Sequence, residues 1–555
     1  MNITIKYGKF DPEAKADSTA TTTDIKPWAD ISDLTIDRVM PPNGMTMERN
    51  YIPLDGTMGF FPSDPSQHDW GWFSESMSNA DCLYATPPTV TITFTQDHKS
   101  PGITLRFYPY TNDYAREVRC TWYDSADNVL EADTFLFDSN TGIIRQDVTA
   151  YRKIKIEIIR SSLPYRYVKL YAIEYGIEET MTDIDIDKAN IVEEIDPISD
   201  TLSVNTLGFN VKMKNPVFSL ISGNTADNML MKKQMMTVTA NGEPFGTFFL
   251  DTWKDDTGRG IAFSFSANDA VGVMDGYQFM GGLYDNAPIR TVLDAIFAVS
   301  FPTGLIVYEL DDDLAGATLT GYIPICSCRE ALQMICFAIG AIADDSRRDY
   351  IWIYGRDIEP TYTIPREEQY LKVTLEPTDY YSGVDIAAYT YTESTEISTP
   401  QDGILPAGQH RIAFSQPLRT LTATGATIIE SGVNFAVLNV VSQQNVKLTG
   451  LVYRANSTVY SVRSTVEPGE VESIAVFEGN TLVNNGNAQT LANSIFQYLQ
   501  YRVQMNPEIR LQGREVGYVT EIPTYQKPIV GIIESLNVNL RGNRAPARIV
   551  GNVVD

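Results

Sequence analysis

The sequence contains little histidine and little cysteine. It has three histidines and five cysteines in 555 residues. His68, His98 and His410 lie apart in polar, turn-like stretches, without the HExxH or HxH spacing that zinc enzymes use. Three of the cysteines fall within 326–336, which does not fit a secreted disulfide framework and favours small buried hydrophobic side chains. We therefore expect no metal and no other cofactor, and folding in a reducing cytoplasm.

Positive charge is also scarce. Lys and Arg number 43 against 70 Asp and Glu, which gives a formal net charge of -27. A surface of this sign repels phosphate backbones and anionic lipid headgroups, so we expect no stable nucleic-acid binding. The longest nearly apolar run, 331–343, is shorter than the ~20 residues that span a bilayer, and residues 1–10 lack the apolar core of an export signal.

Motifs for common catalytic sites are missing. There is no GxSxG elbow, no Walker loop and no GxGxxG that opens a helix after a strand. Carboxylates are abundant, so counting alone does not exclude a glycosidase pair. The run Asp311–Asp313 lies between a strand pattern and a glycine-containing turn, where we interpret it as solvated turn charge. We expect no enzymatic activity.

An acidic stretch over 178–200 separates two parts of the chain. Asp183, Asp185, Asp187 and Glu194 fall at positions 1, 3, 5 and 12 of a calcium-loop register. However, Lys188 occupies the sixth position, where the turn needs glycine, and no helix pattern flanks the loop. We therefore interpret 178–200 as a linker strand in which Ile and Asp alternate.

The composition that is present indicates a mainly β protein of three or four domains. Hydrophobic residues make up 43% and aromatic residues 11% of the chain, and 37 Gly and 29 Pro fit many turns between short strands. One long helix pattern stands out between strand patterns. Ser327 and Glu330 form a capping box before apolar residues that continue to Ile342, and Tyr350–Tyr354 follows as a strand.

The first third of the chain predicts an arm followed by a β-sandwich. Residues 1–50 are polar and lack an apolar period, which is typical of an arm that packs on a neighbour or stays mobile. From 51 to 177, short segments alternate apolar and polar residues between polar turns. The segments are 89–94, 103–107, 118–123, 154–158 and 168–173.

This order of segments, closed by Ile173-Glu174-Tyr175-Gly176, resembles the galactose-binding-like (discoidin-type) jelly roll. Such modules often bind glycans through aromatic faces, so the resemblance implies host-surface glycan contact as a hypothesis. Trp and Tyr in a sandwich also serve as core or interface, and that alternative stays open. The residues that we expect to be exposed for glycan contact are Trp70, Trp72, Trp122 and Tyr123.

The remainder predicts two β regions around a helical insert. Residues 201–272 predict a first small barrel, with a strong hairpin signal at Asn241-Gly242. Residues 273–358 predict an α/β insert, with a helix over 275–298 that has Pro288 in its first turn. Residues 359–555 predict a second barrel that carries a helix over 487–504.

The motifs NGEPFGTFFLDTW, SANDAVGVMD, IRTVLDAIFA and GYIPICSCREALQMICFAIGA, in this order, resemble the tail or baseplate hub proteins of bacteriophages. One motif departs from the pattern, because Gly517-Tyr518 stands where hubs usually have Gly-Asp. The resemblance implies two tube-like β-barrels per chain and a homotrimer whose six barrels match a hexameric tail tube. It implies as partners the tail tube protein, distal tail or baseplate proteins, and a tape-measure protein or central spike.

We therefore expect a structural component of a virion tail, assembled in the bacterial host cytoplasm, whose lumen passes DNA without gripping it. An acidic bore would repel DNA, although the charge would equally keep a large β protein soluble. The alternative function is a stand-alone glycan-binding protein, or a glycoside hydrolase with a carbohydrate-binding module.

Overall fold

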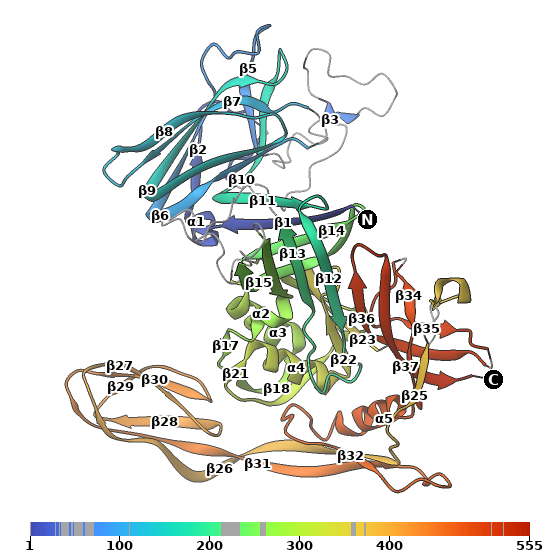
Figure 1. The fold of residues 1–555 in the computed structure, drawn as a ribbon. Helices are drawn as coiled ribbons and strands as arrows, with labels where there is room; N and C mark the ends of the chain where they lie inside the picture. The colour runs from blue at the N-terminus through green and yellow to red at the C-terminus, as the bar shows by residue number, and fades with distance from the viewer. Residues whose placement is uncertain are drawn as a thin grey trace. The chain divides into compact units, whose positions relative to one another are not determined.

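The protein is mainly β, as predicted, and its chain divides into two compact units (Figure 1). The N-terminal unit comprises Lys6–Thr180 and Pro216–Met235, and the main unit comprises Met1–Ile5, Met181–Asn215 and Met236–Asp555. The computed structural model describes residues 2–27, 29–32, 34, 44–45, 48, 59–60, 71–109, 112–212, 234–255, 262–302, 304–356, 362–370, 373–511, 513–525 and 527–554.

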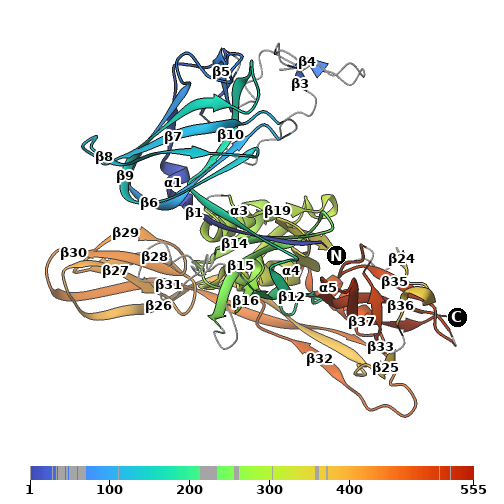
Figure 2. The same cartoon turned by 45° about the horizontal axis from the view of Figure 1, so that its top comes forward.

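The N-terminal unit is built on one antiparallel sheet in the order β5-β10-β6-β9-β7-β8, with β2 beside β6 (Figure 2). Its strands are β2 (Thr19–Thr21), β5 (Trp72–Met77), β6 (Thr89–Phe107), β7 (Ala115–Tyr123), β8 (Val129–Leu136), β9 (Thr141–Ser161) and β10 (Tyr167–Glu174). The long strands β6 and β9 lose their regular register around Ser100 and Gly102, which lets the sheet bend. Both ends of β6 then face one core, since Ile92 and Leu105 belong to the same buried cluster. The predicted β-sandwich is present in the described part of 51–177.

Residues before 50 differ from the predicted arm. They form β1 (Ile3–Phe10), α1 (Pro12–Asp17) and β2. Asp11 caps α1 by accepting hydrogen bonds from the backbone N–H of Glu13 (3.0 Å) and Ala14 (3.1 Å), and Ala14 is buried in the sandwich core. His98 is also not in a turn, because it lies buried in β6 and contacts Asp17 at 2.9 Å. Of the described residues in this segment, α1 and β2 therefore belong to the N-terminal unit, whereas the first residues of β1, up to Ile5, belong to the main unit.

The main unit contains a continuous sheet in the order β14-β15-β16-β13-β12-β36-β37-β33-β25. Its strands are β12 (Ile186–Glu194), β13 (Thr206–Lys212), β14 (Met235–Ala240), β15 (Glu243–Asp255), β16 (Ala262–Asn268), β25 (Thr374–Pro377), β33 (Val503–Asn506), β36 (Ile529–Asn539) and β37 (Arg544–Val553). Strand β12 lies in its interior, because Ile191 pairs with Leu207 on one side and with Val538 on the other. The acidic stretch predicted as a linker strand is thus a strand, and it joins the two β regions that the sequence predicts as separate barrels.

The first of these regions runs from β14 to β12. Its hairpin turns at Asn241 and Gly242, whose φ angles of 54° and 85° are the left-handed pair that a type I′ turn requires. Alternation along β13 points Leu207, Phe209 and Val211 inward. Phe209 stacks on Phe265 of β16 with 4.7 Å between ring centroids.

The second region pairs both of its outer strands, β35 (Val519–Ile522) and β33, with short strands from the part of the chain before 378. Segment 362–377 pairs at its start with β35, through β24 (Tyr362–Thr363), and at its end with β33. Between these points the backbone N–H of Tyr370 donates to the carbonyl of Glu508 in β34 (Glu508–Arg510) at 2.8 Å. Strands β35, β36, β37 and β33 are consecutive neighbours in the sheet. The second barrel over 359–555 stays a prediction, and strands within 383–477 belong to sheets other than this one.

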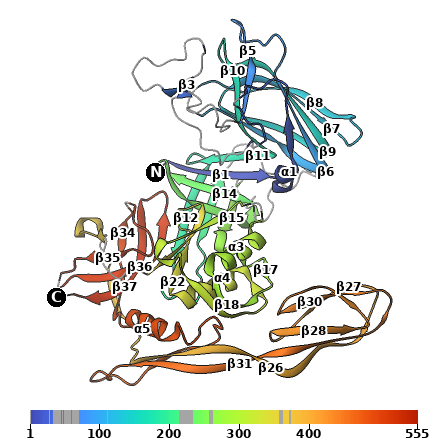
Figure 3. The same cartoon turned by 180° about the vertical axis from the view of Figure 1, so that it is seen from behind.

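The α/β insert follows β16 and packs helices against short strands. Its elements are α2 (Ala270–Met274), β17 (Gln278–Phe279), β18 (Gly282–Pro288), α3 (Ile289–Ser300), β19 (Val307–Leu310), η2 (Asp312–Leu314), β20 (Thr318–Ile323), β21 (Cys326–Ser327), α4 (Cys328–Ile339), β22 (Ala341–Asp344) and β23 (Tyr350–Gly355). Figure 3 shows α3 and α4 beside β17 and β18. The capping box of Ser327 and Glu330 starts α4 as predicted. Gly340 ends the helix in the left-handed region at φ 68°, so Ile342 lies in a strand. The predicted helix over 275–298 begins only at Ile289, because β18 pairs with β20 up to Pro288.

Residues 383–477 form a long ribbon instead of barrel wall. Strand β26 (Gly383–Leu405) pairs with β31 (Gln444–Arg463) along its length and, at its start, with β32 (Ile474–Phe477). At the far end, β27 (Gly408–Ala413), β28 (Leu418–Thr424), β29 (Thr427–Ser431) and β30 (Phe435–Val440) complete a tip with its own apolar core. At the near end the ribbon packs on α5 (Ala488–Tyr498). This helix ends before the predicted residue 504, since β33 begins at Val503.

Gly517 occupies the place where the tail-hub pattern has its Gly-Asp pair. Its φ of 83° is in the left-handed region, and an added Cβ would collide with the hydroxyl of Tyr354. We expect Gly517→Ala to lower the free energy of unfolding by about 1–3 kcal/mol, measured by urea denaturation. Gly513→Ala is the control, because that glycine also has a positive φ (73°) but open space around its Cβ. Equal losses in the two variants would show that the Tyr354 contact contributes nothing.

Candidate assembly surface

The ribbon has one buried and one exposed face near its base. Val384, Ile386 and Ala388 of β26 point toward α5 and are buried there. Because side chains alternate along a strand, Asp385 and Ala387 belong to the opposite face. Ala387 pairs with Val459 of β31, and Asp385 pairs with Val476 of β32. Ala387 itself is only 8% exposed, so we call the three residues Asp385, Val459 and Val476 the ribbon face.

The ribbon face exposes apolar side chains on both sides of β26. Val459 is 58% exposed and Val476 is 59% exposed. The charge at its centre is compensated, since Ser461 Oγ and Arg463 Nη2 donate hydrogen bonds to Asp385 Oδ1 at 2.5 and 2.7 Å. These hydrogen bonds, first that of Ser461, lower the pKa of Asp385. A partner that covers this face would bury Val459 and Val476, and it would not need to supply a cation for Asp385.

The middle of strand β31 is exposed on both faces. Every residue from 454 to 459 is exposed, whereas across from it in β26 only Thr392 is exposed and residues 389–391 are half-buried. Ile397 and Ile404, further along β26, are 66% and 68% exposed. A two-stranded ribbon alone is marginally stable in water, so this stretch depends on the packed elements at its two ends. It offers apolar surface and two strands to a covering partner.

The buried carboxyl groups of Asp269 and Asp345 have raised pKa values, which makes them the first residues to consider for a catalytic role. Burial and their mutual repulsion raise the pKa of Asp269, and burial raises the pKa of Asp345 to about 6. Their geometry is nevertheless structural. Asp269 accepts from the N–H of Gly272 at 2.7 Å, which caps α2, while Asp345 accepts from the N–H of Ala270 at 2.9 Å and from Asn205 Nδ2 at 3.0 Å. Both side chains are buried, so we interpret the pair as a fastening between α2 and the β22–β23 turn.

The residues predicted for glycan contact do not form an exposed aromatic platform. Trp72 is 1% exposed and donates from Nε1 to the carbonyl of Asp24 at 2.7 Å, and Trp122 is fully buried in the sandwich core. Tyr123 is half-buried beneath Lys153, whose Nζ is 4.3 Å from the ring centroid. Trp70 lies outside the described residues. The expected exposure is therefore wrong for Trp72 and Trp122, because both side chains pack in the apolar core of the N-terminal unit. Glycan contact itself stays a prediction.

The other polar residues considered from the sequence are also dispersed. Cys328 and Cys336 are buried, and burial raises the pKa of Cys336 to about 12, as expected of a small hydrophobic side chain. Asp312 and Asp313 are exposed in the 3-10 turn between β19 and β20. Asp187, from the calcium-loop register, pairs with Lys212 at 2.8 Å. Across the part of the chain that the structure describes, no three His, Cys, Asp or Glu side chains are grouped to hold a metal ion, and no helix is long and apolar enough to cross a membrane.

Comparisons with known proteins give structural similarities at low identity. No protein-family model and no curated protein matches the sequence. A tail protein from Neisseria meningitidis MC58 matches with a TM-score of 0.41 and 11% identity over 67% of this chain and 93% of its own. A prophage tail protein from Listeria monocytogenes EGD-e matches with a TM-score of 0.39 and 11% identity over 67% of this chain and 91% of its own. Discoidin II from Dictyostelium discoideum matches with a TM-score of 0.19 and 11% identity over 47% of this chain and 97% of its own.

Proposed function

We propose that the chain is a structural component of a phage tail tip or baseplate, a trimeric hub that joins the tail tube to the distal tip and surrounds the channel for DNA ejection. The observation that carries this proposal is the position of β12 in the main unit. By pairing with both β13 and β36, it fixes two β regions side by side in one sheet. A trimer then presents six such regions around its axis, and each can contact one subunit of a tail tube with six-fold symmetry.

The exposed ribbon supports an assembly role. A long strand pair with Val459, Val476 and Ile397 on its surface is costly for an isolated soluble chain and useful in a complex that buries it. The proposed partners are sister copies, the tail tube protein, distal tail or baseplate proteins, and a tape-measure protein or central spike. DNA would pass the lumen without stable binding, in keeping with the net charge of -27.

Particle composition and oligomeric state test the proposal. We expect the purified protein to form a species of three times the 61.9 kDa chain mass in sedimentation velocity and native mass spectrometry, and a ring with a central hole in negative stain. Mass spectrometry of virus particles should contain the chain. A strict monomer with sugar-dependent activity would instead support the alternative, a stand-alone glycan-binding protein or glycoside hydrolase.

A double substitution tests the ribbon face as part of the assembly. Val459→Asp with Val476→Asp places two charges on apolar surface, so burying that surface against a partner becomes unfavourable by several kcal/mol in total. We expect the trimer or its complex with tail proteins to dissociate at micromolar concentration, while the circular dichroism spectrum is unchanged.

Val129→Asp is the matched control for this variant. Val129 is 57% exposed on β8, in the N-terminal unit, close to the 58% and 59% of the two ribbon valines. The control should assemble like the unmodified protein. Full assembly of the double variant, measured in the same concentration series, would exclude the ribbon face from any interface.

A further inference from the structure

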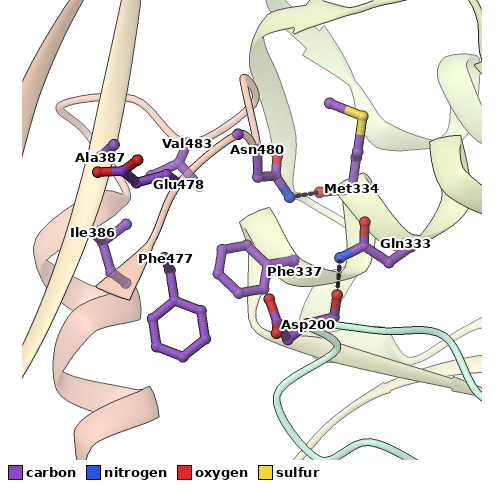
Figure 4. A pocket seen from close by; sticks show the side chains of 11 residues that line it. Asp200, Gln333, Met334, Phe337, Ile386, Ala387, Phe477, Glu478, Asn480 and Val483 are labelled. Atoms are coloured by element: carbon purple, nitrogen blue, oxygen red, sulfur yellow. Dashed lines mark hydrogen bonds between the residues drawn. The ribbon is translucent and has the colours of Figure 1, made fainter. Parts of the chain in front are cut away.

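A small pocket, the α4 pocket, opens in the main unit between α4 and the end of β32. Figure 4 shows Phe337 and Phe477 between two carboxylates, Asp200 on one side and Glu478 on the other. The ring centroids of Phe337 and Phe477 are 5.8 Å apart, with the planes tilted by 39°. The remaining lining comes from Gln333, Met334, Ile386, Ala387, Gly479, Asn480 and Val483.

Hydrogen bonds hold the walls of the α4 pocket in place. Gln333 Nε2 donates to the carbonyls of Ser199 and Asp200 at 2.6 and 3.0 Å, which fixes the loop after β12 against α4. Asn480 Nδ2 donates to the carbonyl of Met334 at 2.9 Å, which fixes the loop after β32 against the same helix. The pocket is therefore preformed, and a ligand would not have to order it.

The volume limits what the α4 pocket can hold. It measures 140 Å³. Pockets for cofactors, sugars and other ligands of that size enclose roughly 300–1,000 Å³, whereas a cavity of about 150 Å³ in another protein holds one benzene molecule. The α4 pocket thus fits a group as large as one side chain and is too small for a sugar unit with its neighbours.

The charges around the α4 pocket select the sign of that group. Asp200 and Glu478 are exposed at the rim, and within the described residues neither carboxylate accepts a hydrogen bond or forms an ion pair. Partial burial, together with the nearby Asp196, raises the pKa of Asp200, so its negative charge lacks compensation. Between the carboxylates lie two phenyl rings, whose faces attract cations. A side chain with an aliphatic stem and a cationic head fits this arrangement, because the stem can pack on the two rings while the head pairs with the two carboxylates.

We propose that the α4 pocket is a socket for an arginine side chain of a partner protein in the assembled tail. Arginine fits better than lysine because its planar guanidinium can stack on a ring and donate to two carboxylates at once. The inference rests on the proposed function for the identity of the partner, while binding of the side chain itself depends on the pocket alone.

The test uses the full-length protein and a synthetic peptide, acetyl-Gly-Arg-Gly-amide, with a citrulline peptide as the neutral control of equal shape. The protein is labelled at its methionine methyl groups, and Met334→Leu assigns the resonance of Met334, which lines the pocket. We expect the arginine peptide to shift this resonance with a Kd in the millimolar range, as befits a single side chain, and the citrulline peptide to bind at least tenfold more weakly.

Two variants complete the test. Asp200→Asn with Glu478→Gln should weaken arginine-peptide binding at least tenfold, whereas Glu472→Gln, an exposed carboxylate that does not line the pocket, should leave it unchanged. No shift of Met334 at about 10 mM arginine peptide, or an equal shift with citrulline, would overturn the proposal. Sedimentation of the same samples reports trimer formation separately: rings without peptide binding refute the socket alone, and peptide binding by a monomer refutes the hub alone.

Discussion

Lys169→Met is expected to lower the free energy of unfolding of the N-terminal unit by about 3–5 kcal/mol. The Lys169 side chain is fully buried, and its Nζ lies 2.7 Å from Glu48 and 2.8 Å from Asp113, whose own side chains are 0% and 3% exposed. Arg166 pairs with Asp113 from the other side at 3.0 Å. Without the lysine, the carboxylates of Glu48 and Asp113 stay buried with only one cation, Arg166, nearby. A buried charge that loses its partner is strongly destabilising because neither water nor another ion compensates it. Urea denaturation followed by tryptophan fluorescence measures the loss.

Arg152→Met is the matched control for the lysine variant. Arg152 pairs with Asp97 at 2.6 Å in the same unit, but the two side chains are 40% and 55% exposed. Exposed pairs contribute about 0–1 kcal/mol, so this variant should be nearly as stable as the unmodified protein. A double variant, Lys169→Met with Glu48→Gln, should recover part of the loss because it removes one of the two buried carboxylates and leaves Asp113 paired with Arg166. Losses below about 1 kcal/mol for Lys169→Met would mean that water reaches the site.

Asp269→Asn is expected to make the stability of the main unit less dependent on pH between pH 5 and pH 8. Burial raises the pKa values of Asp269 and Asp345 in the folded protein above the ordinary value of about 3.9 that they regain on unfolding. The folded state therefore holds more protons than the unfolded state between pH 4 and the folded pKa values, so stability falls as the pH rises through this window. Each excess proton contributes about 1.4 kcal/mol per pH unit.

Asparagine at position 269 removes one ionisable group and keeps an oxygen that caps α2, but its amide nitrogen replaces the oxygen that accepts a hydrogen bond from the N–H of Asn205 at 2.5 Å. The variant therefore loses some stability at every pH, and the pH dependence is the diagnostic quantity. The stability of Asp269→Asn should thus decline less steeply from pH 5 to pH 8 than that of the unmodified protein, in urea denaturations at half-unit pH steps. Asp313→Asn, on the exposed 3-10 turn, is the control and should keep the original slope. If the slope of Asp269→Asn equalled that of the control, the pair would not carry a shared proton.

Local signals in the sequence predicted several elements well. The capping box at Ser327 placed the start of α4, and Asn241-Gly242 placed the β14–β15 hairpin, because each signal consists of groups a few residues apart. The end of α4 was placed too late. Ala341–Ala343 continue the apolar pattern of the helix, and a fully buried strand cannot be distinguished from a buried helix by periodicity.

Features that depend on distant residues were not predictable from patterns. The acidic stretch around Asp187 has the composition of a linker, and only its pairing with β13 and β36 makes it an interior strand. Trp72 and Trp122 look like candidates for exposure until the sheet determines which face each occupies. The α4 pocket brings together residues as far apart as Asp200, Phe337 and Glu478, and no spacing rule connects them.

The shared strand β12 has a mechanical consequence. Strand β12 pairs with β36 from Asn190↔Asn539 to Glu194↔Ser535, and residues 190–192 of this stretch also pair with β13 on the other side. A force on one β region therefore reaches the other through several backbone hydrogen bonds that are loaded in parallel. Hydrogen bonds between strands that are pulled along their length must break together, whereas strands pulled apart from one end lose their hydrogen bonds one after another. We therefore expect the two β regions to move together under load, because a rotation about Ile191 would break hydrogen bonds to both β13 and β36.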